Sequence, residues 1–232
     1  MAKKGEPAKA GAVVRSRGRP RTASTGEGGA DHAVGREGLI DATIELLKHQ
    51  PPSAITPVVV ARAVGVHPSL IRYYFKNRAT LLVAVAERVT ERFGKQVELA
   101  AEQSDGSPRS RLCARIGALI DLNATFPFFH QLIVSEIATS DDPAAQEMIA
   151  KFTNRGQGAY GAILRAGLVD GSFRGMDPGL LYVVVIGMAE FFVSARRQLE
   201  VAQGAPIDEE ELRAVYKTFV CDLVLNGVTK RD

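Results

Sequence analysis

Cysteine is scarce in this sequence, which has two in 232 residues. Cys113 and Cys221 lie far apart along the chain, inside expected helices, and neither belongs to a CxxC pair. The disulfide framework of a small secreted domain has more cysteines at closer spacing. We therefore expect two small buried side chains in a protein of a reducing compartment.

Long apolar runs are also missing. No run approaches the roughly 18 apolar residues that a membrane-spanning helix requires, and the best candidate, Leu180 to Val193, contains Glu190. No apolar signal-peptide segment follows the basic start, and Glu6 and Pro7 interrupt any amphipathic transit helix. We therefore expect a soluble, cytoplasmic protein without a membrane partner.

Patterns of catalytic and metal-binding residues are absent as well. His32, His49, His67 and His130 are not spaced as metal ligands, and neither HExxH nor a nucleophile elbow occurs. A GxGxxG match at 156–161 follows a helical stretch rather than the strand that a dinucleotide site requires, which favours a kinked or loosely packed helix. We expect no enzyme, no metal and no cofactor.

Positive charge is concentrated at the N-terminus. Residues 1–21 contain seven lysines and arginines against Glu6 alone, whereas the whole chain has a net charge of only +3. The rest of the chain is therefore net negative, and the basic segment indicates a polyanionic partner, either nucleic acid or an anionic membrane. Because residues 1–34 contain few large apolar side chains, we expect them to form a flexible arm.

Beyond the arm, the chain has the periodicity of helices and no surviving strand pattern. Helices are expected over 36 to about 50, 57–64, 68–74, 79–99, 109–124, 128–138, 143–166, 178–201 and 208–226. The valines Val58 to Val60 favour a strand locally, so that element stays open. The predicted fold is all-α, with a three-helix DNA-binding domain over 35–80 and a helical bundle over 81–232.

Two short expected helices flank Gly65-Val66-His67, and this is the pattern of a helix-turn-helix unit. Gly65 suits the left-handed conformation that ends a helix. The second helix, 68–74, is about two turns long and carries Arg72 and Tyr73. A helix of this length fits the DNA major groove, with side chains toward base edges and phosphates.

The stretch GVHPSLIRYYFKNRATLL, residues 65–82, resembles the signature of the TetR family of transcriptional regulators. The likeness includes the Gly-Val turn, the apolar Ile71, an aromatic pair before Phe75, a basic residue and a double leucine. GLVDGSFRGMDP resembles the turn that precedes the dimerisation helices of the family. The resemblance implies a dimeric regulator that responds to a small molecule.

Carried over residue by residue, the resemblance assigns DNA contacts to the second helix, the third helix and their flanks. These residues are Thr56, His67, Ser69, Leu70, Arg72, Tyr73, Lys76 and Arg78. Ile71 and Phe75 are expected in the core. The sequence departs from the family at Arg72, usually tyrosine, and at His67, usually a serine N-cap.

The basic arm contains RGRPR, residues 17–21, which resembles the core of an AT-hook. Narrow A·T minor grooves concentrate negative potential, and an extended segment with alternating arginines fits them. We expect Arg17, Arg19 and Arg21 to reach a minor groove beside the operator. A tail that binds phosphates without sequence preference is the alternative.

The central bundle is rich in aromatic side chains, and the resemblance places a small-molecule site there. The candidates are Phe126, Phe129, His130, Ile133, Phe152, Tyr160 and Tyr182; such a stripe also fits an ordinary core. The resemblance further implies a homodimer through the last two helices, 178–201 and 208–226.

The predicted function is a repressor that binds a palindromic operator in double-stranded DNA and is released by a small apolar or aromatic effector. The alternative is an all-helical ligand-binding protein or enzyme whose basic arm attaches to a membrane or to RNA.

Overall fold

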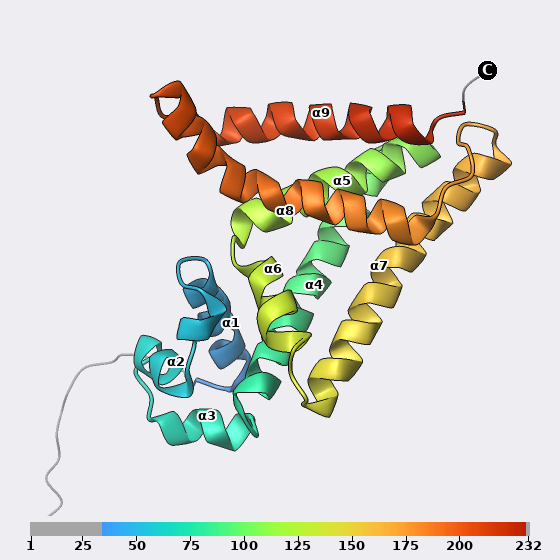
Figure 1. The fold of residues 1–232 in the computed structure, drawn as a ribbon. Coiled ribbons are helices and arrows are strands. Elements are labelled where there is room, and N and C mark those ends of the chain that lie inside the picture. Colours follow the sequence, from blue (N-terminus) through green and yellow to red (C-terminus); the bar gives the residue numbers. More distant parts are fainter. Residues whose placement is uncertain (1–33, 231–232) are drawn as a thin grey trace, which may run out of the picture. The chain divides into compact units, whose positions relative to one another are not determined.

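The computed structural model describes residues 34–230, and the arm residues Arg17, Arg19 and Arg21 lie outside this range. The helices are α1 (Arg36–Leu47), α2 (Pro57–Ala63), α3 (Pro68–Tyr74), α4 (Arg78–Glu102), α5 (Pro108–Thr125), α6 (Phe129–Gln131), α7 (Pro143–Val169), α8 (Pro178–Gln203) and α9 (Glu209–Val228), with a 3-10 turn η1 (Pro52–Ala54) and a π-helical turn η2 (Leu132–Ile137) (Figure 1). The all-α prediction is confirmed.

Most helices begin with the capping residues that the sequence suggests. Side-chain oxygens of Thr56, Asp142, Asp177 and Asp208 accept hydrogen bonds from backbone amides in the first turns of α2, α7, α8 and α9. Asn77 begins α4 with a reciprocal capping box, which satisfies two otherwise unpaired groups. The prediction of helix starts from Asx or Thr before proline is thus confirmed, and Val58 to Val60 are helical.

The first three helices pack around the N-terminal half of α4. Their core joins Ile44, Val60, Ile71, Phe75 and Leu82 in one apolar cluster. Ile71 and Phe75 are buried, as expected. Burial of one face of α3 leaves its other face available to a partner.

A second core lies among α5, α7, α8 and α9. Both α8 and α9 pack on α5, and Phe192 of α8 stacks on Tyr216 of α9 with ring centroids 4.5 Å apart. The GLVDGSFRGMDP turn is anchored here, because the Arg174 amide donates to the Val228 carbonyl over 2.8 Å.

The same turn buries Phe173 against Gly167 of α7. The Phe173 side chain is 1% exposed, and its amide donates to the Gly167 carbonyl. A Cβ at position 167 would overlap the ring. We expect Gly167→Ala to lower the free energy of unfolding by about 1–3 kcal/mol through overpacking.

Gly158→Ala is the matched control for this change. Gly158 lies in the interior of the same helix, and a Cβ at this position would meet no atom within 4 Å. Alanine there should therefore stabilise the protein by about 0.5–1 kcal/mol. Urea unfolding of both variants measures the difference. Equal stabilisation by the two substitutions would contradict the packing described for Phe173.

The GxGxxG match is part of uninterrupted helix, since α7 continues from Pro143 through Val169. The expectation of loose packing is wrong at Gly156, which is buried. The ring of Tyr182 from α8 lies against Gly156, where a Cβ would overlap it. The missing side chain therefore lets α7 and α8 approach closely.

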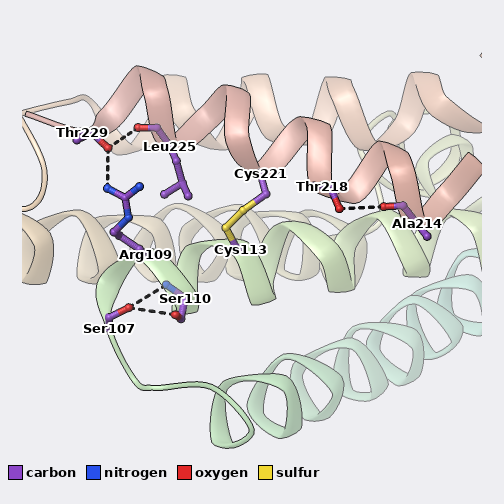
Figure 2. The surroundings of a disulfide bond; sticks show 9 residues. All are labelled: Ser107, Arg109, Ser110, Cys113, Ala214, Thr218, Cys221, Leu225 and Thr229. Atoms are coloured by element: carbon purple, nitrogen blue, oxygen red, sulfur yellow. Dashed lines mark hydrogen bonds between the residues drawn. A yellow bond between two sulfur atoms is a disulfide. The ribbon is translucent and has the colours of Figure 1, made fainter.

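The two cysteines correct the sequence analysis. Figure 2 shows Cys113 of α5 and Cys221 of α9 joined as a disulfide, with Cα atoms 5.3 Å apart. Neither side chain is fully buried. The spacing of the cysteines did not predict this bond, because the two residues are 108 positions apart in the sequence. They meet because α5 and α9 pack side by side. The cysteine pattern therefore does not indicate a reducing compartment.

Helix α8 has no unbroken apolar run of 18 residues, but it is apolar on average. This helix contains an 18-residue window with mean hydropathy 1.8, long and apolar enough to cross a membrane by length and composition. The expectation counted unbroken apolar residues, whereas such a window tolerates isolated polar ones. Only 22% of the window is buried, so most of α8 is half-buried or exposed in the single chain.

Candidate functional site

The turn between α2 and α3 has the predicted geometry. Gly65 has φ 70°, and the Val66 amide donates to the Ala61 carbonyl over 2.9 Å. His67 replaces the usual serine as the N-cap of α3, because its Nδ1 accepts from the Ser69 amide at 3.2 Å. An accepting Nδ1 carries no proton, so this cap requires a His67 ring with its proton on Nε2.

The outer face of α3 and its flanks gathers most of the predicted DNA-binding side chains. Tyr73 is 80% exposed, and its ring meets that of Tyr74 edge-on with centroids 5.0 Å apart. The other exposed members are Thr56, His67, Ser69, Arg72 and Lys76, while Leu70 is half-buried. The structure thus brings a cation, an aromatic ring and hydroxyl groups to one exposed helix face, the chemistry that binds phosphates and base edges.

Arg78 has a different place from the one predicted. Its Nε donates to the Ile55 carbonyl at 2.6 Å and its Nη2 to the Pro52 carbonyl at 2.5 Å. Its Nη1 pairs with Glu136 of η2 at 2.6 Å. This guanidinium therefore fastens the start of α4 to η1 and η2, and the geometry does not support a phosphate contact.

A second bond joins the start of α4 to the bundle. The Asn77 side chain donates to Asp142 at the start of α7 over 2.9 Å. This bond, together with the Ala144 amide, lowers the pKa of Asp142, which stays ionised. The DNA-binding region is thus held to η2 and α7 by polar contacts.

A cavity of about 630 Å³ lies between α4, α5, α7 and α8. Phe152, Tyr160 and Tyr182 line it, in agreement with three of the predicted positions. Its size is that of small-molecule sites. Among residues 34–230 no group of three or more His, Cys, Asp or Glu side chains is placed to hold a metal.

The other four predicted ligand residues do not line this cavity. Phe129 and Ile133 are buried in the core around α4. Phe126 packs against that core with Lys48 over its ring, and His130 Nδ1 lies 2.9 Å from a Glu190 oxygen. Their assignment to the bundle is correct, but their helices direct them to other neighbours.

Sequence reasoning missed the α4 and α5 sides of the cavity. Phe93 and Gly94 line it from α4, and Arg111, Arg115 and Leu119 line it from α5. Phe93 lies on the apolar stripe of α4, a signal for burial only. A charged residue such as Arg115 gives no local signal that it faces a cavity.

The comparisons with known proteins agree with this architecture. The profile of a family described as "Tetracyclin repressor-like, C-terminal domain" matches residues 105–231, and the chain belongs to the TetR family of transcriptional regulators, a family without enzymatic activity. The HTH-type transcriptional regulator BetI of Serratia proteamaculans (strain 568) is 34% identical over 89 residues, which cover 38% of this chain and 45% of that relative. The chain thus matches less than half of that relative's length.

Two solved structures share the fold at low sequence identity. The ketosteroid transcriptional regulator KstR2 of Mycobacterium tuberculosis has a TM-score of 0.62 and 16% identity, covering 84% of this chain and 95% of that one. AibR, solved in complex with isovaleryl coenzyme A and operator DNA, has a TM-score of 0.61 and 16% identity, covering 79% and 96%. At this identity, the two structures show a shared fold alone.

Proposed function

We propose that this protein is a dimeric repressor that binds a palindromic operator through α3 and is released when a small molecule fills the cavity. The exposed face of α3 carries this proposal. Its Ser69, Arg72 and Tyr73 project from a two-turn helix whose opposite side is fixed by Ile71 in the core. Such a helix fits the major groove with its side chains near bases and phosphates.

The proposed domain division is a basic arm over 1–34, a DNA-binding domain over 35–80 and an effector and dimerisation domain over 81–232. Arg17, Arg19 and Arg21 of the arm would reach an adjacent A·T-rich minor groove. The site of action of such a repressor is the cytoplasm.

The exposed faces of α8 and α9 support a homodimer. Leu180, Val184, Gly187 and Phe191 follow one stripe of α8, and the large ones among them are exposed; open space lies over Gly187. Val215, Phe219 and Leu223 repeat every four residues on α9 and are exposed too. Monomeric soluble proteins rarely expose so many adjacent apolar side chains. In a two-fold dimer, the partner subunit would cover both stripes at once.

The cavity supports an effector with a large apolar part. Phe152, Leu119 and Met148 are among its apolar lining residues. AibR, a protein of the same fold, binds both isovaleryl coenzyme A and operator DNA, and this chain has an interior site and an exposed α3 for the same two kinds of partner.

Selection of binding sites from random duplex DNA tests the proposal. The full chain and a variant without residues 1–34 are each selected at two salt concentrations, since phosphate contacts weaken with salt. We expect a palindrome in both selections, with a flanking A·T-rich segment in the full chain alone. A featureless pool that disappears with the arm would overturn the proposal and favour attachment by the arm.

Substitution on α3 should weaken operator binding. We expect Arg72→Ala to raise the dissociation constant about 10- to 100-fold, since one lost base contact costs about 1–3 kcal/mol. Fluorescence anisotropy with the selected operator measures this loss. Arg197→Ala on α8, which removes an exposed arginine elsewhere, is the control and should bind as the parent protein does; equal losses would exclude a specific role for Arg72.

A further inference from the structure

The interior of the cavity holds a cation without a carboxylate partner. Arg115 of α5 lines the cavity, and among the described residues no carboxylate lies within ion-pair distance of it. Its Nε is buried and has no hydrogen-bond partner in the described part of the chain. A buried donor left unpaired is costly and rare in folded proteins.

Two aromatic rings hold the Arg115 guanidinium in place. Its Cζ lies 4.9 Å from the centroid of Tyr160 and 5.6 Å from that of Phe93. Cation–π contacts of this kind orient a guanidinium against aromatic rings. The Nε atom is sealed from solvent, so a molecule in the cavity would have to bind Arg115 through its Nη groups.

The other charged residues of the cavity lie at its edge. Glu87, Glu91 and Glu98 of α4 are exposed, as are Arg111, Lys151 and Arg155. Solvent screens exposed charges. These exposed side chains therefore attract or repel a ligand in the cavity less strongly than a partly buried charged side chain does. Among the described lining residues, Arg115 alone combines a charge with a side chain that is not exposed.

We propose that the effector is an amphiphilic carboxylate, with its carboxylate bound by Arg115 and its apolar part against Leu119, Met148, Phe152 and Ile186. This inference rests on the proposed function, because it names the ligand class of the same cavity. A planar carboxylate accepts two parallel hydrogen bonds from the Nη groups of a guanidinium. It would thus neutralise the Arg115 charge, which a hydrocarbon cannot.

The neighbouring phenol suits the same ligand. Burial raises the pKa of Tyr160 to about 12, although the nearby Arg115 charge opposes the shift. Tyr160 is therefore neutral at physiological pH and adds no negative charge that would compete for Arg115. A carboxylate would meet a positive guanidinium beside a neutral ring.

A binding panel of matched pairs tests the ligand class. The full-length protein is titrated calorimetrically with straight-chain carboxylates from hexanoate to hexadecanoate and with phenylalkanoates, each beside the alcohol of the same skeleton. The variants are Arg115→Gln, Arg115→Lys and, as the control, Arg165→Gln, which changes an exposed arginine of α7 that does not line the cavity. Operator binding is measured for every protein with and without each probe.

The expected result is that at least one carboxylate binds about 10-fold or more tightly than its alcohol, as for a hydrogen-bonded charged group. Arg115→Gln should remove this preference while the alcohol still binds, Arg115→Lys should restore it in part, and Arg165→Gln should retain it. Equal affinity for both members of every pair, or no binding by any carboxylate, would overturn the inference.

The operator measurements separate this inference from the proposed function. Release of the operator by alcohols and carboxylates alike would leave the proposed repressor intact and overturn the anion preference. A preference for carboxylates that depends on Arg115, without any change in operator affinity, would support the ligand class and contradict release by an effector.

Discussion

Replacing both Phe191 and Phe219 by glutamate should convert the proposed dimer to monomers and weaken operator binding by at least about 100-fold. The two side chains are 59% and 61% exposed on α8 and α9. In a two-fold interface each substitution occurs twice, and every introduced carboxylate would lose water without gaining a partner. Sedimentation velocity and operator anisotropy measure the two effects.

Leu99→Glu is the matched control for this double variant. Leu99 is 57% exposed, like the two phenylalanines, but lies on α4 away from the α8 and α9 stripes. It should leave both the sedimentation coefficient and operator affinity unchanged. A double variant that still sediments as the parent protein does would show that these faces are not the dimer interface.

Reduction of the Cys113–Cys221 disulfide should lower the free energy of unfolding by about 2–4 kcal/mol. The bond joins α5 to α9 across 108 residues, and closing so long a loop restricts the unfolded chain strongly. Urea unfolding at one protein concentration, with and without reductant, measures the change. The concentration is fixed because a dimer gains apparent stability by mass action.

The control is a Cys113→Ser, Cys221→Ser double variant. Its unfolding midpoint should not respond to reductant, and it should match that of the reduced parent. Free-thiol titration of the denatured parent without reductant should find no thiol. Two free thiols, with equal midpoints in both conditions, would show that the cysteines remain unpaired.

Signals within a few neighbouring residues were sufficient to predict the helices and the helix-turn-helix unit. Thr56-Pro57, Asp142-Pro143 and the Gly65 turn act within a few residues of themselves, so their consequences could be read from the chain. Ile71 and Phe75 were placed in the core by the resemblance of residues 65–82 to the TetR signature, and both are buried. These elements fix the presentation of Arg72 and Tyr73.

Contacts between distant helices could not be read in the same way. Arg78 follows the recognition helix closely and looked like a phosphate ligand, yet Glu136, 58 residues later, binds it. Phe129 and Phe152 have the same chemistry, but only Phe152 lines the cavity. Which side of a helix meets a cavity depends on the packing of other helices, and the sequence of one helix does not contain that information.

Because α4 is long, a small tilt of the helix displaces its ends by several ångströms. Its first turn is bound through Arg78 to the carbonyls of Ile55 and Pro52, and its second half lines the cavity at Phe93 and Val97. At 25 residues, the helix is a rod about 37 Å long, so a tilt of about 5° moves one end by about 3 Å relative to the other. That travel is close to the rise of about 3.4 Å between successive base pairs. A ligand that tilts this helix by about 5° would therefore move α3 relative to the cavity by nearly one base-pair step.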